Sequence, residues 1–229
     1  EENQAGEKTG EGISSVSFGD LPHLNQDLEG DASVEFMFQL ATDEILDYDP
    51  CLICHQKPGG GILNTRFAIH LNRDLTSLRY LNGKTDTLIL PPDGHLRTGR
   101  WYHFLATSKP RQEFRAYIDG VECFLDMGSL AFGSNATECQ LHIGASSENG
   151  DHLALTCAID EVAIYDTALT AQDIARHVDA AGLETTRKRL VSNVVQQKES
   201  EKQANQEDLL ARLNDPALLS TGETKIYRD

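Results

Sequence analysis

Between Val16 and Tyr165 the apolar residues come in short runs in which apolar and polar positions alternate. A period of two is typical of β-strands with one buried face, and several such strands at close spacing indicate an antiparallel sandwich or barrel. The clearest runs are 33–40, 66–71, 77–83, 101–107, 114–120, 139–144 and 157–165. Stretches rich in Gly, Pro, Asn and Asp separate these runs and are typical of turns. We therefore predict an all-β fold for this part of the chain.

The pattern becomes helical after Thr170. Thr170 is a typical N-cap with Asp173 three residues later, and Gly182 is a typical end of a helix. A second helical stretch extends from about Glu184 to Leu213, and its polar middle offers no face to bury. We expect the first helix to pack on the sandwich. The second is expected to be a solvated linker or an oligomer contact.

These patterns divide the chain into three segments. Residues 1–12 are polar and Gly-containing, and we interpret them as a flexible lead-in. Residues 13–182 form the predicted β domain with its short helix, and residues 183–229 form a helical linker. We expect the linker to lead to a further domain after Asp229.

The composition narrows the classes of partner. The chain has 229 residues, with 20 Lys and Arg against 36 Asp and Glu, which gives a net charge of −16. Such an acidic surface repels phosphate groups. We therefore predict that the protein binds neither nucleic acids nor anionic membrane surfaces. No run approaches the roughly 18 apolar residues that a membrane span needs, so we predict no membrane insertion.

The cysteines and the first residue bear on the compartment. Five cysteines permit two disulfides and one free thiol. Their pairing stays open: Cys51 or Cys54 could pair with Cys123, Cys139 or Cys157. The sequence begins with Glu1 rather than Met, as a processed secreted protein would. We therefore expect a secreted, periplasmic or cell-surface protein.

Four segments resemble, in order and spacing, the motifs of laminin G-like (concanavalin A-like) jelly-roll domains. The segments are GRWYHFLATS (99–108), FRAYIDG (114–120), CQLHIGAS (139–146) and CAIDEVAIYDTALTAQDIARH (157–177). The resemblance covers residues 13–180. It implies an antiparallel two-sheet jelly-roll sandwich, here followed by a short C-terminal helix and a helical tail. It also places Trp101 and His103 on the strand that opens the second half, and residues 160–162 on the last strand.

Two of these segments carry physical expectations of their own. Asp119 and Gly120 predict a two-residue turn with positive φ angles, across which Tyr117 and Val121 would face each other. Trp101 lies in an alternating strand and is expected to bury its ring, whose indole N–H then needs a partner.

The stretch CLICHQ (51–56) contains Cys51, Cys54 and His55 in the spacing of a c-type haem attachment site. Such a site belongs to a small helical domain, whereas the neighbouring segments here are strands. In a regular strand the odd separation of Cys51 and Cys54 would also place their side chains on opposite faces. We therefore predict a structural strand, with a c-type haem protein as the alternative. A zinc site of Cys51, Cys54, Cys139 and His142 meets the same geometric objection.

The resemblance implies a possible Ca²⁺ site, because some jelly rolls of this kind hold the ion through Asp side chains at a loop rim. Asp160 is the candidate ligand, and no other cofactor is expected. The alternative is that Asp160 accepts hydrogen bonds from backbone N–H groups at a strand end. Further oxygens could come from Asp43, Glu44, Asp47 and Asp49.

Catalysis is not expected from these residues. Glycoside hydrolysis on this scaffold needs two carboxylates on one strand, typically E-x-D-x-x-E, and Asp160 and Glu161 are adjacent residues expected to face opposite ways. The sequence contains no G-x-S-x-G, P-loop or H-E-x-x-H motif. We assign no catalytic residue.

The resemblance implies a secreted, non-catalytic module that binds a carbohydrate or an extracellular protein, as an accessory domain of a larger protein. The exposed aromatics expected for a carbohydrate face are Tyr48, Tyr80 and Tyr102. An alternative role is the N-terminal accessory module of a glycoside hydrolase. It rests on residues 213–229, LNDPALLSTGETKIYRD, which resemble the lead-in to the catalytic part of β-glucosidase-like, glucosylceramidase-like proteins.

Overall fold

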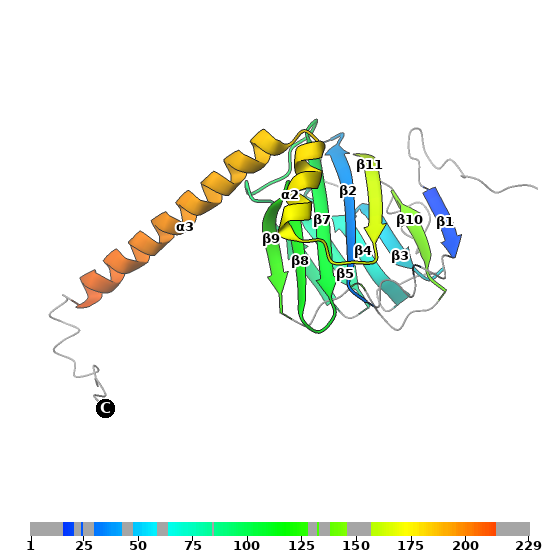
Figure 1. Cartoon of the computed structure of the whole chain (residues 1–229), viewed down its shortest axis with the longest axis horizontal. Coiled ribbons are helices and arrows are strands. Elements are labelled where there is room, and N and C mark those ends of the chain that lie inside the picture. The colour runs from blue at the N-terminus through cyan, green and yellow to red at the C-terminus, as the bar shows by residue number, and fades with distance from the viewer. Residues whose placement is uncertain are drawn as a thin grey trace, which may run out of the picture. The chain divides into compact units, whose positions relative to one another are not determined.

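The structure is a computed structural model of the whole chain (Figure 1). It describes residues 16–20, 24, 30–42, 48–58, 64–83, 85–127, 132, 138–145 and 157–213. The chain forms two compact units, residues 1–187 and residues 188–229. The domain limits expected from the sequence, 1–12, 13–182 and 183–229, stay predictions.

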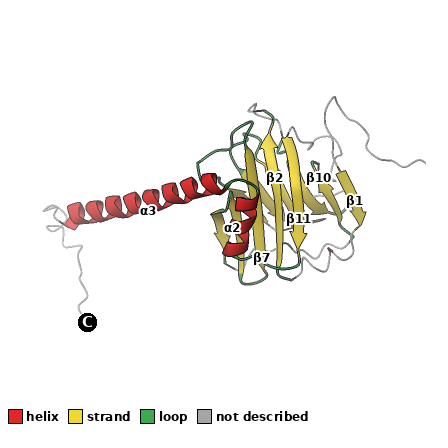
Figure 2. Ribbon diagram, turned by 45° about the horizontal axis from the view of Figure 1, so that its top comes forward, coloured by secondary structure: helices red, strands yellow, loops and turns green. Residues whose placement is uncertain are grey.

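The first unit contains two antiparallel sheets that lie face to face (Figure 2). The six-stranded sheet has the order β1 (Val16–Asp20), β10 (Gln140–Ile143), β3 (Cys51–Gln56), β4 (Thr65–Leu71), β5 (Leu78–Asn82), β6 (Thr85–Ile89). The five-stranded sheet has the order β11 (Cys157–Tyr165), β2 (Ala32–Leu40), β7 (Trp101–Lys109), β8 (Glu113–Ile118), β9 (Val121–Asp126). The predicted all-β, two-sheet jelly-roll sandwich is confirmed.

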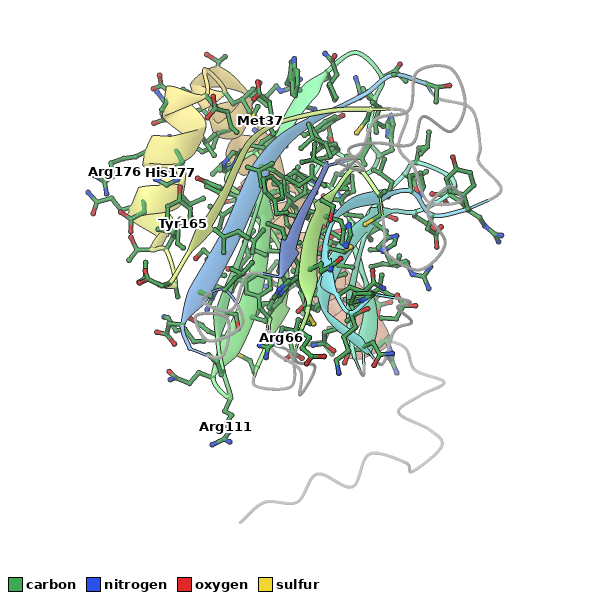
Figure 3. All side chains as sticks on the ribbon, turned by 90° about the vertical axis from the view of Figure 1, so that its right-hand side faces the viewer. Met37, Arg66, Arg111, Tyr165, Arg176 and His177 are labelled. Atoms are coloured by element: carbon green, nitrogen blue, oxygen red, sulfur yellow. The ribbon has the colours of Figure 1, made fainter. Side chains whose placement is uncertain are left out.

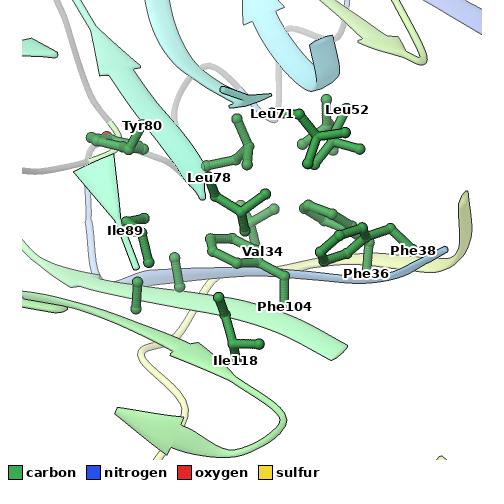
Figure 4. Close-up of a cluster of buried hydrophobic side chains, with 14 of the residues drawn as sticks. Val34, Phe36, Phe38, Leu52, Leu71, Leu78, Tyr80, Ile89, Phe104 and Ile118 are labelled. Carbon is green, nitrogen blue, oxygen red and sulfur yellow. The ribbon is translucent and has the colours of Figure 1, made fainter. Parts of the chain in front are cut away.

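Alternate side chains of each sheet fill the space between them (Figure 4). Phe36 and Phe38 of β2 point inward, where Phe36 lies 5.1 Å from Phe104 and Phe38 stacks at 5.3 Å on Tyr102. Opposite them, the six-stranded sheet contributes Leu52, Leu71, Leu78, Tyr80 and Ile89. This period-two pattern is what the sequence displays, because each strand has one face in the core and one face outside it.

Trp101 departs from the expectation that its ring lies in the core. It begins β7, and alternation along that strand directs Tyr102 and Phe104 inward, where both are fully buried. Trp101 and His103 therefore belong to the outer face of the five-stranded sheet, and Trp101 is only half-buried. The prediction that Trp101 buries its ring in the core was wrong, because Trp101 occupies a position of β7 that faces outward.

The β8–β9 hairpin has the predicted two-residue turn. Asp119 and Gly120 both take positive φ angles, 52° and 74°. Such a turn pairs the residues that flank it, so Ile118 faces Val121. The expected pairing of Tyr117 with Val121 was therefore wrong, since Tyr117 faces Glu122 instead.

Asp119 also has a role that the turn alone does not require. Its side chain is fully buried, where Oδ1 accepts a hydrogen bond from the His103 N–H at 2.9 Å and Oδ2 is paired with Arg100. Arg100 in turn pairs with Asp93 at 2.9 Å and lies 4.3 Å above the ring of Tyr102. The Asp119 carboxylate thus connects the turn to the start of β7, and each of its two oxygens has a partner there.

Helix α2 (Ala171–Ala180) begins and ends as the sequence predicts. Thr170 Oγ1 accepts a hydrogen bond from the Asp173 N–H at 3.3 Å, and the Asp173 carboxylate accepts one from the Thr170 N–H at 3.0 Å. This reciprocal capping box satisfies two backbone donors. At the other end Gly182, with φ 75°, and the residue after it donate to the carbonyls of Asp179 and Val178. This is the Schellman motif.

The same helix packs on the outer face of the five-stranded sheet. Ile174 and Val178 are buried against Leu105 of β7 and Tyr117 of β8. Burial of a side chain of this size contributes about 1.5–3 kcal/mol, so two of them fix the helix firmly. Figures 1 and 2 show α2 lying on this sheet, and Figure 1 shows it over β7 and β8.

Helix α3 (Glu184–Leu213) has the bounds that the sequence predicts. Most of its residues are exposed, including the apolar Val191, Val195, Leu209 and Leu210. Neither α2 nor α3 is long and apolar enough to cross a membrane.

Candidate functional site

A cavity of about 390 Å³ opens on the outer face of the five-stranded sheet, next to α2. We call it the Glu35 pocket. Strands β2, β7 and β11 provide its floor and one wall, and the end of α2 provides the other. Its lining residues are Glu35, Met37, His103, Glu161, Val162, Ala163, Tyr165, His177, Ala180 and Ala181.

Glu35 lies at the base of this pocket and is only 7% exposed. Its register in β2 places it between Leu105 of β7 and Ala163 of β11, so three strands enclose it. The carboxylate accepts hydrogen bonds from His103 Nε2 at 3.1 Å and from the hydroxyl of Tyr165.

The third donor to Glu35 comes from α2. His177 Nδ1 lies 2.9 Å and 3.1 Å from the two carboxylate oxygens of Glu35. Its ring is also 5.9 Å from that of Tyr165, and Figure 3 shows these two side chains close together beside α2. The capping box at Thr170 fixes the start of the helix, and therefore the direction in which His177 points.

These donors determine the charge of the site. Burial by itself raises the pKa of Glu35, but the hydrogen bonds from His103, Tyr165 and His177 outweigh it and lower the pKa to about 2. Burial and the adjacent carboxylate raise the pKa of Tyr165 to about 12. At neutral pH Glu35 is therefore an anion that only accepts hydrogen bonds, and Tyr165 is a neutral donor.

The ionised carboxylate fixes the proton positions of both histidines. His103 donates from Nε2, and its Nδ1 is buried with no hydrogen-bond partner, so a second proton there would be an unpaired buried donor. His177 donates from Nδ1, and its side chain is 32% exposed, which leaves Nε2 as an acceptor that a ligand can reach.

A β-bulge in β11 forms the rim of the pocket. Asp160 pairs with Met37 and Ala163 pairs with Glu35, so two residues of β11 oppose one residue of β2. Glu161 takes a φ of 51°, and its N–H donates to the Asp160 carboxylate at 2.9 Å. Asp160 and Glu161 are both exposed, so the expectation that they face opposite ways was wrong. The bulge brings Glu161 to the pocket.

The Ca²⁺ site at Asp160 stays a prediction. Within the described ranges, no three His, Cys, Asp or Glu side chains gather closely enough to hold a metal ion. Of the other oxygens suggested by the sequence, Asp49 accepts from the Arg73 N–H at 2.8 Å and is paired with Arg79. Asp43, Glu44 and Asp47 lie outside the described residues.

The CLICHQ stretch is strand β3, as predicted, but with a bulge at Leu52. Cys51 pairs with His70 and Ile53 pairs with Ile69, so Leu52 is an extra residue. Cys51 and Cys54 consequently share one face and pack together with Ala68. The expectation that the odd separation puts the two thiols on opposite faces was wrong.

His55 nevertheless does not join the two thiols. It pairs with Phe67 and Leu141, both members of the inter-sheet core, and its Nε2 donates to the carbonyl of Cys139 at 3.2 Å. Burial, and after it the charge of Arg66, lowers the pKa of His55 to about 4. A haem would need His55 on the side of the thiols, and the strand places it on the other.

All five cysteines carry free thiols, so none of the pairings that the sequence permits is present. Burial raises the pKa of the Cys51 thiol, as does its neighbour Cys54. Burial likewise raises the pKa values of Cys123 and Cys157 to about 12. These are protonated core thiols rather than thiolate ligands.

The tyrosines expected to form a carbohydrate-binding face are not available for one. Tyr80 and Tyr102 are fully buried in the core, because their strand positions have inward parity. Tyr48 is half-buried. The expectation was wrong for the first two residues.

Sequence reasoning did not single out the Glu35 pocket. Glu35, His103 and His177 lie far apart in the chain, and only the pairing of β2 with β7 and the packing of α2 bring them together. The local sequence carried no signal of this pocket, because Glu35 shares the outer face of its strand with Ser33, Met37 and Gln39, and three of these four residues are polar.

Comparisons with known proteins agree on the fold. A family model described as the concanavalin A-like lectin/glucanases superfamily matches residues 14–175. The sialidase of Trypanosoma rangeli in complex with sialic acid aligns with a TM-score of 0.52 and 16% identity, over 71% of this chain and 25% of the sialidase. This chain thus spans about a quarter of that protein.

A second solved structure, a SAP-like pentraxin from Limulus polyphemus, aligns with a TM-score of 0.48 and 12% identity, over 72% of this chain and 76% of the pentraxin. A search of curated proteins found no match.

Proposed function

Since this chain belongs to the concanavalin A-like lectin/glucanases superfamily, we propose that it is a carbohydrate-binding module and that a sugar unit binds in the Glu35 pocket. The observation that carries the proposal is the convergence of polar groups from β2, β11 and α2 on one cavity. Its volume of about 390 Å³ lies in the range of small-ligand sites, roughly 300–1,000 Å³.

The lining offers what a sugar requires. A sugar hydroxyl donates and accepts hydrogen bonds, and the pocket presents the Nε2 atom of His177 and the carboxylate of Glu161 as acceptors. Met37 and Ala163 add apolar surface for the C–H groups of a pyranose ring. Few placed polar groups on an otherwise apolar wall are typical of ligand pockets.

We propose that the module binds without catalysis. A glycosidase needs one carboxyl group with a raised pKa that donates a proton to the leaving group. The pKa of Glu35 is lowered to about 2, so this group has no proton to give at neutral pH. Glu161 is an exposed carboxylate at the rim. The pocket thus has hydrogen-bonding capacity without a general acid.

Two wider proposals rest on the sequence alone. One is that the protein is secreted, periplasmic or on the cell surface. The other is that a further domain follows Asp229, with a glycoside hydrolase as the candidate suggested by residues 213–229. An extracellular protein ligand and the absence of nucleic-acid binding likewise stay predictions.

The test is to block the pocket without disturbing Glu35. Ala180 lines the pocket from α2 and is solvent-exposed, so Ala180→Phe places a ring in the cavity. Gln172 lies on the same helix outside the lining residues, so Gln172→Phe is the matched control.

Binding is first located on a glycan array and then measured by calorimetry with the sugar that binds. We expect Ala180→Phe to weaken binding at least about tenfold and Gln172→Phe to leave it unchanged. Equal binding by both variants would show that the sugar binds outside the Glu35 pocket. The absence of any bound glycan would refute the carbohydrate-binding function.

A further inference from the structure

His177 presents a hydrogen-bond acceptor to the pocket. Glu35 is an acceptor only, and His177 Nδ1 lies within 3.1 Å of both its oxygens, so a neutral His177 ring holds its single proton on Nδ1. Nε2 then carries the lone pair. Within the described part of the chain, Nε2 has no hydrogen-bond partner, and the imidazole lines the cavity. A ligand group next to it must therefore donate.

The charge of the pocket also disfavours ligands that carry an acidic group. Among the residues that the structure describes, its lining includes two carboxylates, Glu35 and Glu161, and no Lys or Arg. The nearest cation on the helix, Arg176, is paired with Asp173 of the same helix. Two unit charges of like sign at contact distance repel by up to about 4 kcal/mol near a protein surface.

We infer that the pocket takes a neutral or amino sugar that donates a hydrogen bond to His177 Nε2, and that it excludes acidic sugars such as sialic and uronic acids. The inference rests on the proposed function and adds the ligand class to it.

The experiment is a protein-observed NMR titration with four probes: methyl glucoside, glucosamine, glucuronic acid and N-acetylneuraminic acid. We expect the first two to shift the resonances of Tyr165 and His177, and the two acids to bind about tenfold more weakly or not at all. Glu161→Gln removes one charge from the rim and leaves the buried Glu35 carboxylate unchanged. It should therefore reduce the difference in affinity between glucosamine and glucuronic acid.

A second arm uses His177→Phe, which removes the acceptor and keeps a ring of similar size. It should weaken methyl glucoside binding about tenfold, and if this variant does not fold, the comparison of neutral with acidic sugars on the wild-type protein still tests the ligand class. Acidic sugars that bind as well as neutral ones would overturn the ligand class and leave the carbohydrate-binding function standing. If no sugar of any charge shifted the pocket resonances, both would fall.

Discussion

Gly120 and Val178 lie so close together that a Cβ atom on the glycine would stand 3.1 Å from Cγ2 of the valine. The same atom would be 2.6 Å from Cδ of Arg187, which is held by an ion pair with Asp179 at 2.8 Å. The β8–β9 turn thus touches the end of α2 at a point that has no room for a side chain.

Gly120→Ala is therefore expected to lower the free energy of unfolding by about 2–3 kcal/mol, from backbone strain at a φ of 74° plus the contact with Arg187 and Val178. Gly94→Ala is the matched control, because Gly94 has a φ of 88° and open space around it. It should cost about 1 kcal/mol. Urea unfolding curves provide both values, and equal losses would show that α2 adapts to the methyl group.

Glu35→Ala removes the shared acceptor of His103, Tyr165 and His177. These donors are buried or half-buried, and leaving them without a partner is expected to cost about 2–4 kcal/mol. Chemical denaturation followed by fluorescence measures the loss. Glu199→Gln, on the exposed part of α3, should change stability by less than about 0.5 kcal/mol. A loss of that small size for Glu35→Ala would contradict the role of the carboxylate as a common acceptor.

The acid stability of the domain follows from the same carboxylate. The pKa of Glu35 falls from its ordinary value of 4.5 to about 2 in the folded protein. A lowered pKa contributes stability that is complete above the unfolded value and is lost as the pH falls through the folded value. The free energy of unfolding should thus decline between about pH 4.5 and pH 2, and Glu35→Gln should make that decline shallower. Parallel acid profiles for the two proteins would argue against it.

Thr170→Ala removes the N-cap of α2 and is expected to destabilise the domain by about 1 kcal/mol. The first turn of the helix should also fray, which hydrogen exchange at the first-turn amides, such as that of Asp173, would detect. Gln172→Ala changes an exposed residue of the same turn and leaves the cap intact, so it should be neutral. Equal exchange rates in the two variants would show that tertiary packing, rather than the cap, holds the first turn.

The thiols should be unreactive in the folded protein. Burial raises the pKa values of Cys123 and Cys157 to about 12, and Cys51, Cys54 and Cys139 are fully buried. A thiol reagent at mildly alkaline pH is expected to label none of them within minutes, and all five in denaturant without a reductant. Fewer than five labelled thiols in denaturant would reveal a disulfide.

The sequence predicted well where a local rule decides the structure. The Thr170 cap, the Gly182 end of α2 and the turn at residues 119–120 each depend on a few neighbouring residues, and all three are present. The strand pattern was likewise readable, because one buried face per strand gives a period of two.

The failures share a physical origin. The bulges at Leu52 and Glu161 each insert one residue, so the side chains that follow in the strand point to the opposite face from the one that simple alternation predicts. No residue type near either site requires a bulge. The Glu35 pocket was missed because its members meet only when β2, β7, β11 and α2 assemble. The alternation along a strand shows that it has two faces but not which face is buried. For this reason Trp101 was expected inside the core.

The pairing of β2 with β11 sets the order in which this domain can be completed during synthesis. Strand β2 leaves the ribosome early, whereas its partner β11 is made last among the strands. Until Tyr165 has emerged, the outer edge of β2 is unpaired and Glu35 lacks two of its three donors. Such long-range pairing slows folding and leaves the nascent chain dependent on protection from aggregation. A chain that stops before β11 would display the open edge of β2 and would leave Glu35 with one of its three donors, His103.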